Sequence, residues 1–178
     1  ITHPGAPSRV GETDSIAKAM AEFRDVERIS NPGATIDGGD VLRMGNTFFV
    51  GMSDRTNKAG ADNLESLLCK YGSYAVVPVP VPYGLHLKSF VTEAAENTVL
   101  IANALVDHPA FASFDKIIVP EDEEYATNAL LINGTLIMAA GFEKTIKLCE
   151  DAGCKVLPLD MSEFRKMDGA LTCLSLRF

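Results

Sequence analysis

Three pairs of short apolar runs, each pair interrupted by a polar turn, predict three β-hairpins along the chain. The clearest turn is Asn133-Gly134, because both residues tolerate the positive φ angles of a type I′ turn. The hairpin strands are expected at residues 40–44 with 47–51, 89–92 with 98–102, and 129–132 with 135–139.

A helical pattern follows each of the three hairpins, and a further apolar run follows each of these three helices; a fourth helix, at 15–23, precedes the first hairpin. Residues 58–71 show this best, because Leu64, Leu67, Leu68 and Tyr71 fall on one helical face. The other helices are expected at 15–23, 105–114 and 143–152, and the runs that follow predict strands at 74–79, 116–120 and 155–159. A last apolar run at 170–176 predicts a strand that would open one more unit.

This strand–turn–strand–helix–strand order repeats at a spacing of about 40 to 50 residues, which is typical of propellers and solenoids. Corresponding unit starts lie near Asp40, Lys88, Asn128 and Gly169. The pattern predicts an α/β propeller formed as a single domain over residues 1–178, with about three and a half units in this chain. A closed ring would need more chain than this.

Composition and charge narrow the function classes. The chain has 178 residues, 47% apolar and 22% charged, as in an ordinary globular protein. The formal net charge of −8 argues against nucleic acid or an anionic membrane as the main partner. No apolar run approaches the roughly 20 residues that span a bilayer, and no signal peptide is visible. The four cysteines show neither metal-ligand spacing nor the dense framework of a disulfide-rich protein. A reducing, cytoplasmic location is therefore expected.

Three segments carry residue types that work together in thiol catalysis. Cys173 lies in the last apolar run, His86 follows a turn, and Asp37 and Asp40 flank two glycines. Taken singly, each has a plain structural interpretation: a buried core cysteine, a structural or surface histidine, and an ordinary turn. All three fall at equivalent edges of the repeat, where they would converge on the axis of a ring. Jointly they predict a thiol nucleophile with its acid/base partner and an orienting carboxylate.

Charged residues elsewhere in the chain include two candidate substrate-binding arginines and one acidic run. Arg9 and Arg55 are candidates to bind a carboxylate, because guanidinium groups bind carboxylates through two parallel hydrogen bonds. An isolated arginine is otherwise a surface charge. The acidic run at 121–124 is interpreted as a solvated loop rather than a cation site.

Together these segments resemble the dimethylarginine dimethylaminohydrolase family of the pentein, or amidinotransferase, superfamily. The stretches that carry the resemblance are 1–9, 34–42, 48–57, 84–90 and 168–173, which occur in order over essentially the whole chain. The resemblance implies a five-bladed ββαβ propeller that hydrolyses methylated arginines to citrulline and a methylamine, without metal or organic cofactor. It also implies N-terminal blades ahead of Ile1 that supply acidic residues for the guanidinium, so these residues expressed alone are expected to be insoluble or inactive.

The resemblance assigns a role to each candidate. Cys173 is the implied nucleophile, His86 the general acid/base, and Asp37 the carboxylate that orients the histidine. The implied substrate-binding residues are Arg9 and Arg55, on the substrate's α-carboxylate, and Asp168 with the neighbouring Met167, near its cationic head.

Lys88 favours one substrate class within the superfamily. Arginine deiminases and amidinotransferases carry an aspartate two residues after the histidine, where this chain has Lys88, and a methylated guanidinium needs fewer hydrogen bonds. Citrulline or arginine as the substrate of a hydrolase or deiminase stays an alternative. An alternative of another class is a non-catalytic propeller that binds a partner, with Cys173 simply in its core. The expected partner is a small molecule, and a homodimer is a possible assembly.

Overall fold

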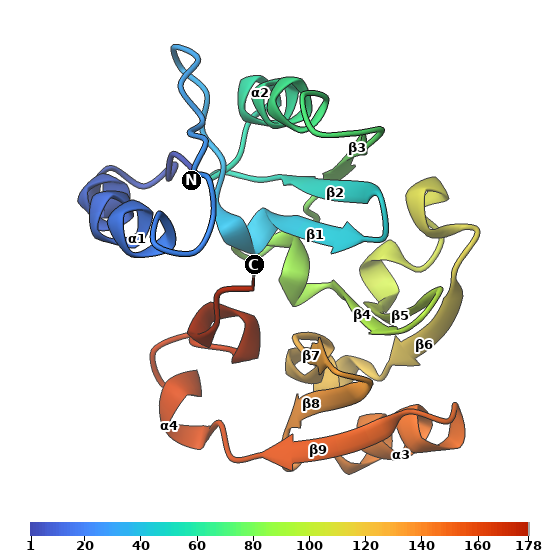
Figure 1. Ribbon diagram of the computed structural model, residues 1–178. Helices are drawn as coiled ribbons and strands as arrows, with labels where there is room; N and C mark the ends of the chain where they lie inside the picture. The colour runs from blue at the N-terminus through green and yellow to red at the C-terminus, as the bar shows by residue number, and fades with distance from the viewer. Residues whose placement is uncertain (178) are drawn as a thin grey trace. The chain divides into compact units, whose positions relative to one another are not determined.

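The computed structural model describes residues 1–177, and it divides into two compact units, residues 1–87 and residues 88–177. Both units are built from the same three-stranded sheet, in which an antiparallel hairpin is followed by a crossover to a parallel third strand (Figure 1). No helix among residues 1–177 is both long and apolar enough to cross a membrane.

The first unit contains one sheet. Strands β1 (Val41–Met44) and β2 (Thr47–Met52) form the hairpin, and helix α2 (Lys58–Leu68) leads to β3 (Ala75–Pro80), which pairs parallel to β2. Helix α1 (Thr13–Met20) precedes this sheet. Two 3-10 helices, Pro7–Glu12 and Gly38–Asp40, stand before α1 and β1.

Helix α2 begins where Asn57 caps it. The Asn57 side chain accepts a hydrogen bond from Gly60 N at 2.9 Å, which satisfies one of the donors that a helix start leaves unpaired. The helix then packs Ala61 against Ile36 and Val50, all three buried in the core of this unit. This packing fixes the residue immediately before Asp37.

The second unit repeats the sheet twice. Its first sheet is β4 (Val91–Ala95), β5 (Thr98–Ala102) and β6 (Asp115–Val119), and its second is β7 (Leu130–Ile132), β8 (Thr135–Ala139) and β9 (Lys155–Leu159). Helix α3 (Glu143–Asp151) joins β8 to β9, and α4 (Ser162–Arg165) follows. The remaining 3-10 helices are Leu87–Ser89, Asn103–Leu105, Pro109–Phe111, Glu121–Thr127 and Leu171–Leu174.

The structure confirms the predicted repeat. All three hairpins form at the predicted places, and the turn residues Asn133 and Gly134 have φ angles of 49° and 73°, as a type I′ turn requires. Helices α1, α2 and α3 and the three parallel strands also form where the pattern predicts them. Residues 1–177 therefore carry three complete sheets of the propeller repeat.

Two predicted elements are wrong. Residues 105–114 do not form an α-helix, because Pro109 lacks an N–H and the His108 side chain caps Ala110 N, which starts a short 3-10 helix instead. Residues 170–176 do not form a strand: residues 171–174 are a 3-10 helix, and the described strands give this segment no ladder partner. The half unit expected there is therefore absent from the described residues.

The acidic run at 121–124 has a structural role that the sequence analysis missed. Buried Glu123 accepts hydrogen bonds from Thr145 N at 2.7 Å and Thr145 Oγ1 at 2.6 Å, and it also accepts from Lys144 N. Its carboxylate thus lies at the N-terminus of α3, where negative charge is favourable. Burial alone would raise the pKa of Glu123, but these hydrogen bonds hold it below its usual value.

We expect Glu123→Gln to lower the free energy of unfolding by about 0.5–2 kcal/mol at neutral pH, the usual effect of losing a helix cap. Because the folded-state pKa of Glu123 is lowered, its stabilisation is present above the usual carboxyl pKa of 4.5 and is lost as the pH falls below it. Urea unfolding of both proteins at pH values above and below this point measures the difference. Exposed Glu121→Gln is the control, and equal stability of the two variants at neutral pH would contradict the capping role.

Candidate active site

Asp37 is a buried carboxylate at the centre of a small polar cluster in the first unit. It lies just before β1, at the start of the Gly38–Asp40 turn, and is 3% exposed. Its Oδ1 accepts from Gly5 N at 3.0 Å, and its Oδ2 lies 3.1 Å from His86 Nε2 and 3.5 Å from an Arg9 guanidinium nitrogen. The structure thus brings three of the predicted residues together.

The His86 ring lies directly against the backbone of Gly39. A Cβ atom at Gly39 would stand 2.5 Å from His86 Cγ and 2.6 Å from Nδ1, so only glycine leaves room for the ring. A carboxylate only accepts hydrogen bonds, so the contact with Asp37 places the proton of the neutral imidazole on Nε2. Nδ1 is then the nitrogen that can accept a proton, and the His86 side chain keeps 20% of its surface exposed.

Asp40 holds the segments that carry Asp37 and His86. It is fully buried, and its Oδ2 accepts from Ser53 Oγ at 2.7 Å and Thr56 Oγ1 at 2.6 Å, while Oδ1 accepts from Leu87 N at 2.9 Å. Thr56 Oγ1 in turn accepts from Asp37 N at 3.0 Å. The interpretation of this motif as an ordinary turn therefore leaves out what Asp40 does: it holds the residue after His86 and, through Thr56, the backbone of Asp37.

The two predicted arginines lie beside the same cluster. Arg9 is half exposed, and its guanidinium pairs with Glu12 at 3.1 Å as well as approaching Asp37. Arg55 is partly buried, and its N–H donates to Ser53 Oγ at 3.0 Å. Gly5 packs directly on the Arg55 backbone, where a Cβ would overlap the Arg55 carbonyl oxygen. Both guanidinium groups are thereby carried on segments anchored around Asp37.

The other three predicted residues belong to the second unit. Cys173 lies in the Leu171–Leu174 3-10 helix and is exposed, so its interpretation as a buried core cysteine is wrong. The buried thiol of this unit is Cys149, where burial raises the pKa to about 12. Asp168 is exposed with a φ of 55°, a left-handed conformation that aspartate tolerates better than most residues, and Met167 beside it is 85% exposed.

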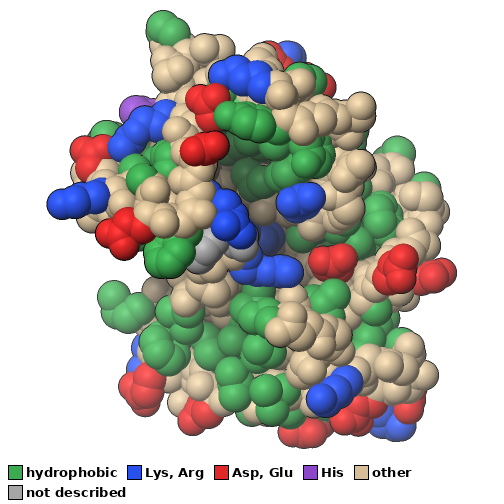
Figure 2. Space-filling model, in the orientation of Figure 1, with side chains coloured by type: hydrophobic (Ala, Val, Ile, Leu, Met, Phe, Trp, Pro, Cys, Tyr) green, Lys and Arg blue, Asp and Glu red, His purple; other side chains and the backbone are tan. Residues whose placement is uncertain are grey.

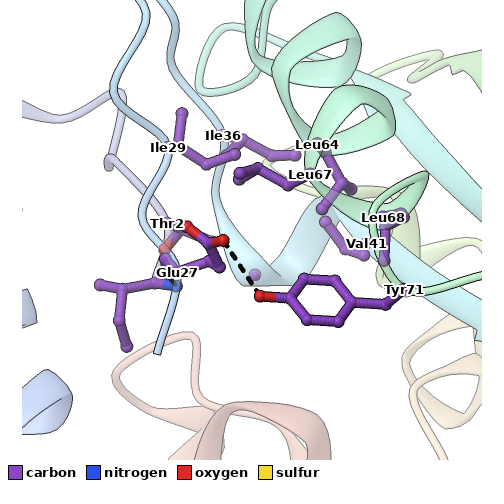
Figure 3. Close-up of a pocket in the computed structure, with 11 residues that line it drawn as sticks. Thr2, Glu27, Ile29, Ile36, Val41, Leu64, Leu67, Leu68 and Tyr71 are labelled. Carbon is purple, nitrogen blue, oxygen red and sulfur yellow. Dashed lines mark hydrogen bonds between the residues drawn. The ribbon is translucent and has the colours of Figure 1, made fainter. Parts of the chain in front are cut away.

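A cavity of about 270 Å³ lies elsewhere in the first unit, between α2 and β1 (Figure 2). Its lining is mainly apolar, and the hydroxyl of Tyr71 at its edge donates to Glu27 at 3.0 Å (Figure 3). This bond raises the pKa of Tyr71. The hydrogen bond from Lys70, followed by this one from Tyr71, lowers the pKa of Glu27. None of the predicted site residues lines the cavity. Across residues 1–177, no three His, Cys, Asp or Glu side chains are grouped to hold a metal ion.

Residues 15–118 match the family model described as arginine deiminase, which defines the class. The chain is 41% identical to an N(G),N(G)-dimethylarginine dimethylaminohydrolase from Pseudomonas aeruginosa, covering 100% of this chain and 70% of that protein. It is 42% identical to the enzyme of the same name from Streptomyces coelicolor, covering 99% of this chain and 67% of that protein. The chain therefore belongs to the dimethylarginine dimethylaminohydrolase family.

Solved structures agree with this assignment. The Pseudomonas aeruginosa enzyme, solved as a cysteine-to-serine mutant complexed with citrulline, is 39% identical and matches with a TM-score of 0.95 over 100% of this chain and 70% of that chain. The N-terminal domain of a cyanobacterial arginine dihydrolase matches with a TM-score of 0.87 at 22% identity, which is a likeness of fold. The predicted pentein fold is confirmed.

We expect Gly39→Ala to displace the His86 ring and break its contact with Asp37, because the new Cβ would stand 2.5 Å from His86 Cγ. The matched control is Gly38→Ala, since a Cβ at Gly38 has no atom within 4 Å. Crystal structures of both variants measure the distance from His86 Nε2 to the Asp37 carboxylate. An unchanged distance in Gly39→Ala would contradict this account of the glycine.

Proposed function

We propose that this protein hydrolyses Nω-methylated arginines to citrulline and methylamine or dimethylamine, through a covalent intermediate on Cys173. The observation that carries the proposal is the pairing of His86 with buried Asp37 at 3.1 Å in a chain that also presents an exposed thiol at Cys173. Membership of the family supports it. So do a structure of the Pseudomonas aeruginosa enzyme complexed with citrulline and a structure of a dimethylarginine dimethylaminohydrolase variant as an adduct with S-methyl-L-thiocitrulline.

In the first half of the reaction the Cys173 thiolate attacks the guanidinium carbon and forms a C–S bond. The bond from that carbon to the methylated nitrogen then breaks, and protonated His86 donates its proton to the departing amine. Asp37 stabilises the imidazolium and keeps the ring oriented, as the carboxylate of a catalytic triad does.

In the second half, water attacks the carbon of the thiouronium intermediate while His86 accepts a proton from it. The C–S bond breaks, the sulfur leaves as thiolate, and the water oxygen becomes the ureido oxygen of citrulline. The second proton of the water is lost to solvent as the ureido carbonyl forms, and the released amine takes up one proton in water as its ammonium ion. Protons and electrons then balance without a cofactor, so the proposal requires none.

Substrate binding is assigned by charge. Arg9 and Arg55 bind the α-carboxylate, and Asp168 with Met167 contacts the region of the cationic head. Lys88, two residues after His86, places no carboxylate there, which favours a methylated guanidinium over an unmodified one. A small molecule in the cytoplasm is the expected partner, and a homodimer is a prediction that light scattering can test.

The deciding experiment incubates the purified protein separately with asymmetric dimethylarginine, arginine and citrulline, and measures dimethylamine, ammonia and citrulline or ornithine. Release of dimethylamine and citrulline from dimethylarginine supports the proposal. Ammonia from arginine or citrulline alone would favour the alternative hydrolase or deiminase. No turnover of any of the three would favour a non-catalytic binding protein, although such a protein has no need of the His86–Asp37 pair.

We expect Cys173→Ser to abolish dimethylarginine hydrolysis and leave the melting temperature nearly unchanged, because the swap removes the thiolate at an exposed position. Cys69→Ser is the matched control, since Cys69 is also an exposed free cysteine. The measurement is kcat for the three proteins. Retention of even about a tenth of wild-type kcat in Cys173→Ser would exclude covalent catalysis through this sulfur.

We expect Arg55→Ala to lower kcat/KM for dimethylarginine by at least about 30-fold, because breaking one partner of a desolvated charge pair costs about 2–5 kcal/mol. Decarboxylated dimethylarginine has no carboxylate for Arg55 to bind, so its kcat/KM should change little. Arg43→Ala, at an exposed arginine on β1, controls for the loss of a positive charge. Equal losses for the two substrates would show that Arg55 does not bind the carboxylate.

A further inference from the structure

Asn128 holds the segment that carries Cys173. It lies between the Glu121–Thr127 3-10 helix and β7, and is only 8% exposed. Its Oδ1 accepts from Thr172 N at 3.0 Å, and its Nδ2 donates to Thr172 Oγ1 at 3.1 Å. Both hydrogen-bonding groups of the amide therefore engage the residue immediately before the thiol.

The same amide also reaches the chain next to His86. Asn128 Nδ2 donates a second hydrogen bond to the carbonyl oxygen of Lys88 at 3.1 Å. Lys88 follows Leu87, whose N–H is held by Asp40. The short stretch after His86 is thus fixed by a buried carboxylate at one residue and a buried amide at the next.

Tyr125, three residues before Asn128, holds the start of the same segment. The Tyr125 hydroxyl donates to the carbonyl oxygen of Gly169 at 2.7 Å, and the Arg165 guanidinium stacks over the Tyr125 ring at 4.8 Å. The Leu171–Leu174 helix is a single 3-10 turn, which has poor internal hydrogen-bond geometry. Side chains from the 121–128 region therefore supply the contacts that order this turn.

We propose that Asn128 is a positioning residue for the reaction: it holds Thr172 against the Lys88 carbonyl oxygen, and through Thr172 it fixes the direction of the Cys173 sulfur. The inference rests on the proposed function of Cys173. An asparagine is required because one amide supplies an acceptor for Thr172 N and two N–H donors for Thr172 Oγ1 and Lys88 O. Aspartate keeps the acceptor but has no N–H to give to Lys88, and alanine loses all three contacts.

The test compares wild type, Asn128→Ala and Asn128→Asp. Three quantities are measured: kcat and KM for dimethylarginine, the melting temperature, and the rate of Cys173 alkylation by iodoacetamide across the neutral pH range, located by peptide mass spectrometry. The control is Asn63→Ala, because Asn63 is also a buried asparagine, 5% exposed, whose side chain accepts from Ser30 N and Asn31 N in the other unit.

If Asn128 positions the thiol, kcat of Asn128→Ala falls by about 10- to 100-fold with KM changed less than about threefold, since misplacement by about 1 Å carries that penalty. The pH profile of Cys173 alkylation also changes, whereas Asn63→Ala loses stability but keeps both kcat and the alkylation profile. Asn128→Asp should lie between wild type and Asn128→Ala, and it decides the matter if the alanine variant does not fold.

An alkylation profile and kcat in the Asn128 variants equal to those of Asn63→Ala would overturn the proposal and leave Asn128 a purely structural residue. The alkylation arm does not depend on turnover. If the wild type hydrolyses no substrate, the proposed function fails. The positioning of the thiol is still tested: a changed alkylation rate of Cys173 in the Asn128 variants supports it, and an unchanged rate contradicts it.

Discussion

The fully buried carboxylate of Asp40 is the constraint on which the first unit depends. A buried charge is costly unless hydrogen-bond donors satisfy it, and Asp40 accepts from Ser53, Thr56 and the N–H of Leu87. These donors come from the loop after β2 and from the segment that carries His86, so satisfying one carboxylate brings the two segments together. Gly51 contributes by having no side chain, since a Cβ there would stand 2.6 Å from Asp40 Oδ1.

The chemistry-bearing residues sit on irregular segments, and the sheets hold those segments still. Asp37 precedes β1, His86 precedes a 3-10 turn, and Cys173 lies in another. Residues outside the strands can present their side chains to a ligand, but strand pairing does not hold their backbone in place, so other hydrogen bonds must do so. Asp40 supplies the anchor in the first unit, and Asn128 with Tyr125 supplies it in the second. The two units thus use the same strategy with different side-chain chemistry.

The net charge of −8 argues against nucleic acid or an anionic membrane as the main partner. Under the proposed function, Arg9 and Arg55 bind the carboxylate of a modified amino acid, and Asp168 lies near its cationic head. Lys88 adds a positive charge where the sequence pattern of deiminases places an aspartate. Under the same proposal, selection of a methylated guanidinium rests on fewer hydrogen-bond acceptors at its head.

The sequence by itself determined the repeat, because hairpins depend on local turn chemistry and helices on local periodicity, as at Asn133-Gly134 and in α2. It also indicated Asp37, His86 and Cys173, since their residue types in those short motifs are informative without coordinates. Only the tertiary structure decided the rest. The apolar run at 170–176 predicts a strand, but the described strands offer it no ladder partner. Hydrogen bonds from Asn128 and Tyr125 hold the segment instead, and residues 171–174 form a 3-10 turn that exposes Cys173. The capping role of Glu123 and the hydroxyl donors Ser53 and Thr56 were invisible for the same reason: each acts on a partner brought to it by folding, and no local pattern records that partner.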